Sequence, residues 1–123
     1  MGYPRTVATA YAALDPALTT PGRAEAMVFS KVTRRMEAAF ADVGSHPAER
    51  VTALHDNRRL WEAVAIACAS DDNALAPALR ASLVSLAGFV DCHTSEVMGG
   101  AAEPSVLVEI NRRVAAGLSA GGF

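Results

Sequence analysis

The side chains that could support catalysis or metal binding are few in this sequence, and most of the possible pairs involve His93. Cys92 directly precedes His93, but adjacent residues of a helix point about 100° apart and cannot form a nucleophile and base pair. Pairing His93 with Cys68 would require two helices to place them face to face. His93 and Glu96 have a spacing that could hold a metal, but no second ligand set accompanies them. We therefore expect no enzyme activity, no metal and no cofactor, and a His93 bonded to a backbone carbonyl or a neighbouring helix.

A dense polar group precedes the only tryptophan, running Asp56-Asn57-Arg58-Arg59 before Leu60 and Trp61. In one interpretation Asp56 or Asn57 bonds across the fold while an arginine reaches a carboxylate or a helix end. In the other, an exposed arginine beside an aromatic residue forms a binding hot spot. The sequence leaves both interpretations open, although Trp61 itself is predicted to be core.

Three arginine pairs occur along the chain, and together they could form a basic stripe that faces RNA. They are Arg34-Arg35, Arg58-Arg59 and Arg112-Arg113. Acidic residues lie within a few positions of each pair and would interrupt the basic stripe. They are Glu37, Asp56, Glu62 and Glu109. This mixture favours a solvated surface with salt bridges.

The composition favours one helical domain that binds protein. The chain has 123 residues, 51% of them hydrophobic but only 6% aromatic, and alanine, the best helix former, accounts for much of the hydrophobic fraction. A net charge of −2 disfavours nucleic acid as a direct partner. No apolar run is long enough to span a membrane and no signal peptide is evident. Cys68 and Cys92 are predicted to be buried reduced thiols, so we expect a cytoplasmic protein.

Prolines and glycines divide the chain into helical segments. Pro21, Pro47, Pro77 and Pro104 each stand near the start of a segment with helical periodicity, where a missing N–H has no consequence. The pattern predicts helices over residues 21–42, 47–70, 76–98 and 104–119, and a shorter one near 4–14. We expect an all-α, single-domain bundle of four to five helices over residues 1–123, frayed at 1–2 and 119–123.

Each predicted helix carries an apolar stripe on one face. The stripe of residues 76–98 is the clearest, and its spacing of three and four residues predicts that this helix is central. It consists of Leu79, Leu83, Leu86, Val90, His93 and Val97. The other stripes are Phe29, Val32, Met36, Phe40 and Val43; Leu54, Leu60, Trp61, Val64 and Cys68; and Leu107, Ile110, Val114 and Leu118.

Several ordered segments resemble the FlaF family of alphaproteobacterial flagellar regulators. The family pattern includes D-N-R-R-L-W, N-x-L-P, L-R-x-x-x-x-S-L, H-T-S-x-V-M and I-N-R. Its counterparts here are residues 56–61, 73–75, 79–86, 93–98 and 110–112. The resemblance extends from about Tyr11 to Leu118, with Gly22 standing where the family has an arginine.

This resemblance implies a cytoplasmic protein that binds newly made flagellin through its terminal segments and supports flagellin synthesis and export. FlbT is a further expected partner. The alternative is post-transcriptional regulation of flagellin, acting with FlbT or on flagellin messenger RNA. The residues that could contact a partner are Asp56, Asn57, Arg58, Arg59, Trp61, His93, Thr94, Asn111 and Arg112.

Overall fold

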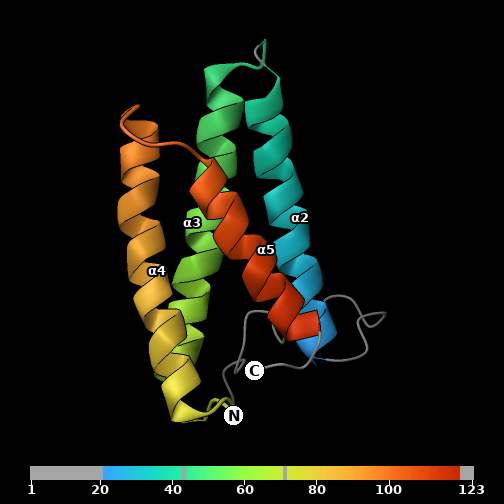
Figure 1. Ribbon diagram of the computed structural model, residues 1–123, viewed down its shortest axis with the longest axis vertical. Helices are drawn as coiled ribbons and strands as arrows, with labels where there is room; N and C mark the ends of the chain where they lie inside the picture. Colours follow the sequence, from blue (N-terminus) through green and yellow to red (C-terminus); the bar gives the residue numbers. More distant parts are fainter. Residues whose placement is uncertain (1–20, 43, 71, 120–123) are drawn as a thin grey trace.

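A computed structural model describes residues 21–119 apart from 43 and 71, and these residues form four helices (Figure 1). They are α2 (Pro21–Ala41), α3 (Pro47–Ala69), α4 (Pro77–Met98) and α5 (Ser105–Ser119). The predicted all-α fold is confirmed, and every helix boundary lies within one residue of its predicted position. The shorter helix expected at 4–14 and the fraying expected at 1–2 fall outside the described residues. Of the range 119–123 that was expected to fray, only Ser119 is described, and it is the last residue of α5.

Prolines begin the helices as the sequence predicts, because the first amides of a helix have no intrahelical partner. Pro47 follows His46, whose Nδ1 accepts a hydrogen bond from the Ala48 N–H at 3.1 Å and so caps α3. Pro77 follows Ala76, which provides no side-chain cap. The start of α4 is stabilised instead by the loop that precedes it.

That loop, between α3 and α4, is organised around the buried side chain of Asn73. Its Nδ2 donates to the Ala67 carbonyl at 3.0 Å, and its Oδ1 accepts from the Leu75 N–H at 2.8 Å. Arg80, one turn into α4, donates to the Ser70 carbonyl at 2.8 Å. Asn73 and Arg80 therefore fix the direction in which α4 leaves α3.

The turn between α4 and α5 depends on Gly100, which has a φ of 80°. This left-handed conformation favours glycine because a Cβ would be strained there. The Gly100 N–H donates to the Val97 carbonyl and the Ala101 N–H to the Glu96 carbonyl. These bonds end α4 and turn the chain back toward α5.

The helices pack in the spatial order α4, α3, α2, α5. α3 lies between α4 and α2, while α5 packs along α2 and crosses in front of α3 in Figure 1. No Cα of α5 comes within 8 Å of a Cα of α3. The prediction that residues 76–98 form the central helix is therefore wrong: α4 packs on α3 and touches α5 only slightly.

Large side chains fill the space between α3 and α5. Trp61 of α3 is 1% exposed and packs edge-on against Phe29 of α2, with ring centroids 5.4 Å apart. Leu54, Met36 and Leu107 are also almost completely buried. The prediction that Trp61 belongs to the core is confirmed.

The buried stripe of α4 is rotated from the predicted one. The buried residues of α4 are Leu83, Ala87, Val90, Thr94 and Val97. Leu79, Leu86 and His93 are only half-buried, because α4 faces α3 and not a ring of helices. Small Ala87 lies where α3 approaches closely. On α2, Val43 of the predicted stripe lies outside the described residues.

One carboxyl group lies among the apolar side chains at the end of the bundle where α2 begins and α5 ends. Glu25 lines a small cavity there with Phe29, Cys68, Val114 and Leu118. Desolvation by this burial raises the pKa of Glu25 to about 7. The same burial, with a smaller contribution from Glu25, raises the pKa of the Cys68 thiol.

Glu25 should make stability depend on pH. A carboxyl whose pKa is higher in the folded than in the unfolded protein stabilises the fold while it is protonated. The free energy of unfolding should therefore fall as pH rises from about 4.5 to about 7, and Glu25→Gln should remove this part of the fall. Urea denaturation between pH 5 and 8 measures the free energy of unfolding of the parent and of Glu25→Gln. Parallel curves for parent and variant would contradict the assignment.

Candidate functional site

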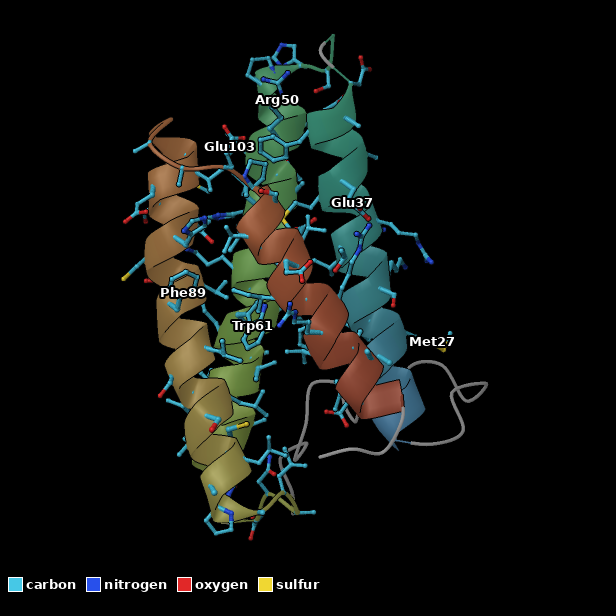
Figure 2. All side chains as sticks on the ribbon, in the orientation of Figure 1. Met27, Glu37, Arg50, Trp61, Phe89 and Glu103 are labelled. Carbon is cyan, nitrogen blue, oxygen red and sulfur yellow. The ribbon has the colours of Figure 1, made fainter. Side chains whose placement is uncertain are left out.

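Three side chains from the resembling segments form a buried hydrogen-bonded network between α3 and α5. The Trp61 Nε1–H donates to Asn111 Oδ1 at 2.9 Å. The Asn111 Nδ2 in turn donates to Asn57 Oδ1 at 2.6 Å. Figure 2 shows Trp61 in the space between these helices. Asn57 and Asn111 are fully buried, so the network connects α3 to α5 inside the protein and is not a contact surface.

Asn57 and Trp61 are one helical turn apart on α3, which places both on the face toward α5. Asn111 is on the only face of α5 that can reach them, between Leu107 and Val114, which are also buried. A buried indole N–H or amide without a partner costs about 1–3 kcal/mol. The network satisfies the indole and the Asn111 amide, and so fixes the register of α5 against α3.

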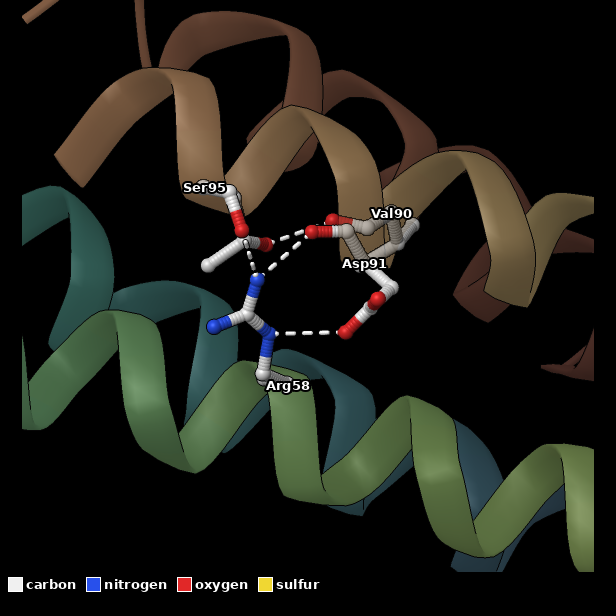
Figure 3. Close-up of polar contacts among 5 residues, drawn as sticks. Arg58, Val90, Asp91 and Ser95 are labelled. Atoms are coloured by element: carbon white, nitrogen blue, oxygen red, sulfur yellow. Dashed lines mark hydrogen bonds and ion pairs between the residues drawn. The ribbon is translucent and has the colours of Figure 1, made fainter. Parts of the chain in front are cut away.

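Arg58 forms a second polar connection, from α3 to α4 (Figure 3). Its Nη2 donates to the Asp91 carbonyl and to Ser95 Oγ, both at 2.6 Å. Its Nε lies 2.9 Å from Asp91 Oδ1. The predicted pairing of one arginine with a carboxylate is confirmed, and Arg58 joins α3 to α4.

The remaining polar candidates face outward. Arg59 is exposed and Asp56 is half-buried on the side of α3 toward α2. Arg112 pairs with Glu37 across α5 and α2. Arg113 pairs with Glu109 at 2.9 Å, so the expected salt-bridged surface is present at these arginines.

His93 has the structural role expected for it. Its Nε2 lies 3.1 Å from the Glu103 carbonyl oxygen, and its ring stacks on Phe89 at 5.3 Å. The His93 Nδ1 lies 3.8 Å from Glu96 Oε2 on the same helix. Thr94, fully buried, donates to the Val90 carbonyl at 2.6 Å. These contacts lie within α4 or join α4 to the loop that leads to α5, so His93 and Thr94 have structural roles.

The two cysteines differ, which corrects the prediction that both are buried. Cys68 is buried but Cys92 is exposed. Cys92 follows buried Val90 by two positions, and two residues of a helix span about 200°, so it faces away from the core. Cys68 lies beside Leu83, and His93 is ten residues further along α4, about 15 Å by helical rise. The structure does not bring Cys68 and His93 together.

Neither a metal site nor a helix that could span a membrane is found among the described residues. Within residues 21–119, leaving out 43 and 71, no three His, Cys, Asp or Glu side chains gather as a metal site. None of the helices in this part of the chain is long and apolar enough to cross a membrane.

The outer faces of the helices carry two grooves that the sequence interpretation missed. One, of about 460 Å³, lies between α2 and α3. The other, of about 300 Å³, lies between α3 and α4 and includes Val84 and Gly88. Ile66 and Val84 are exposed apolar residues on otherwise polar faces. Such interruptions of a polar face were visible in the sequence and could have indicated a surface.

Comparison with known proteins agrees with the five matching segments. The family model described as flagellar protein FlaF matches residues 7–118. The chain belongs to the FlaF family. A search of curated proteins and a search of solved structures each gave no match. Membership of the FlaF family identifies a flagellar protein, and the FlaF segments 56–61, 93–98 and 110–112 supply the contacts described above.

Asn111→Ala should strongly destabilise the protein. The substitution leaves the buried Trp61 Nε1–H and Asn57 Oδ1 without partners, and two such groups together cost about 2–5 kcal/mol. Chemical denaturation measures the change in the free energy of unfolding. The neighbouring Arg112→Ala is the control, because its exposed ion pair contributes about 0–1 kcal/mol. Equal effects of the two substitutions would argue against the network.

The contribution of Arg58 to the connection between α3 and α4 can be tested with the adjacent Arg59 as a control. Arg58→Ala should lower the free energy of unfolding by about 1–2 kcal/mol, since it removes charge-assisted bonds to α4 at a partly exposed site. Arg59→Ala should change it by less than about 0.5 kcal/mol. Thermal melts of the two variants make the comparison. A larger loss for Arg59→Ala would reverse the assignment.

Proposed function

We propose that this protein binds newly made flagellin in the cytoplasm, through flagellin's terminal segments, and thereby supports flagellin synthesis and export. The observation that carries the proposal is the FlaF family match over residues 7–118. The family resemblance supplies flagellin as the partner. A binding role, without chemistry of its own, agrees with the use of His93, Arg58 and Asn111 in packing.

The surface supports a protein partner. Val84, which lines the groove between α3 and α4, is 42% exposed, and exposed large apolar residues are typical of interaction surfaces when they lie beside a groove. Flagellin termini that are disordered as monomers and amphipathic as helices would be suitable ligands for such surfaces. The net charge of −2 gives little attraction to the phosphates of a messenger RNA.

Isothermal titration of the full chain with monomeric flagellin from the same organism tests the proposal. We expect a dissociation constant on the order of micromolar or tighter, about −8 kcal/mol. Flagellin that lacks its terminal segments is the matched control and should give no heat. Absence of heat with both proteins would contradict flagellin binding. If flagellin gives no heat but titration with FlbT or with flagellin messenger RNA does, the result would support the regulatory alternative.

A further inference from the structure

The groove between α3 and α4, called here the α3–α4 groove, has a floor of small side chains. Ala65 of α3 and Ala87 of α4 line it together with Gly88 and the edge of the buried Trp61 ring. A Cβ built on Gly88 would meet no atom within 4 Å. The backbone of α4 is therefore open to close approach by another segment.

An exposed apolar side chain lies beside this floor on α4. Val84, one turn before Gly88, lines the groove and is 42% exposed. Neither α2 nor α5 covers this side, because both lie beyond α3 or across its other face. The groove thus presents an apolar strip with Val84 as its exposed anchor.

The lining restricts what kind of segment can occupy the groove. An extended chain would bring unpaired backbone N–H and C=O groups against alanine, glycine and valine, which offer no side-chain partners. A helix satisfies these groups internally and presents only side chains. Small residues in the floor also allow a helix to approach closely. The shape and chemistry favour a helix with an apolar stripe.

Charge at the rim restricts the occupant further. Arg58 and Asp91 line one end of the groove and neutralise each other. Glu62, also at the rim, is exposed and forms no ion pair with a described residue. The net charge of the rim is therefore negative. A basic residue beside the apolar stripe of the occupant would complement it.

We propose that the α3–α4 groove binds one amphipathic helix of a partner protein, with its apolar stripe on Val84, Gly88 and Ala65 and a lysine or arginine near Glu62. This proposal rests on the proposed function, under which the helix belongs to a terminal segment of flagellin. It places the contact surface away from Asn57 and Asn111, and of the network residues only Trp61 lines the groove.

Gly88→Leu is the direct test, because its side chain would occupy the groove while its Cβ meets no atom within 4 Å. The substitution should keep or raise the thermal midpoint, since leucine is a better helix former than glycine. It should weaken the binding of flagellin, measured by titration, at least tenfold. The matched control is Ala38→Leu, at an exposed position in the α2–α3 groove, which should bind like the parent.

Glu62→Arg provides a second variant that reverses the rim charge and should also weaken binding. Parent-like binding by Gly88→Leu, with the parent binding flagellin, would overturn the groove but leave the proposed function intact. Loss of binding in Ala38→Leu alone would move the site to the α2–α3 groove. No binding by the parent itself would overturn both proposals. A dimer of the parent that Gly88→Leu dissociates would assign the groove to a second copy of this chain.

Discussion

The placement of α5 depends on the hydrogen bonds that join Trp61 to Asn111 and Asn111 to Asn57. α3 and α5 are too far apart for close backbone packing, so large side chains must fill the space between them. A tryptophan there brings an N–H group that needs a partner in the absence of water. Asn111 provides it and is itself held by Asn57. The Asn57 Nδ2, which carries two N–H groups, has no partner among the described residues, and the rest of the packing must offset this cost.

This constraint divides the FlaF segments by role. In segment 56–61, Asn57 and Trp61 bond toward α5 and Arg58 bonds to α4. α3 therefore makes polar contacts with both of these helices. The side of α3 and α4 away from α5 is left uncovered as a result. The α3–α4 groove on that side combines residues of the family segments, such as Arg58, Trp61 and Val84, with residues between them, such as Ala65 and Gly88.

The sequence predicted much of the fold because prolines, glycines and apolar spacing act locally. Helix boundaries followed from Pro21, Pro47 and Pro77, and the burial of Trp61 followed from its size and its stripe. The neighbours of each helix could not be predicted in the same way. The stripe of α4 was compatible with a central position, and only the packing shows that α4 is peripheral, because it lies on α3 and barely touches α5.

The candidate site was predicted less well than the fold. Asn57 and Asn111 belong to residue types that usually lie at the surface, and nothing local indicates that they meet across 54 positions of sequence. Arg58 and Arg59 are adjacent and identical in type, so their different roles arise from helix direction alone. The groove at Gly88 arises from the packing of two helices, and its one sign in the sequence was Val84, an apolar residue outside the predicted stripe of α4.

The separation of a buried frame from an exposed docking face can be observed in one experiment. Two-dimensional ¹H–¹⁵N NMR of the labelled protein, recorded with and without flagellin, reports on both at once. Amide resonances of Ala65, Val84 and Gly88 should shift on binding, while the Asn57 and Asn111 side-chain resonances stay in place and exchange slowly with solvent. Shifts centred on Asn111 and the Trp61 indole, with Gly88 unchanged, would show that the network is itself the contact surface.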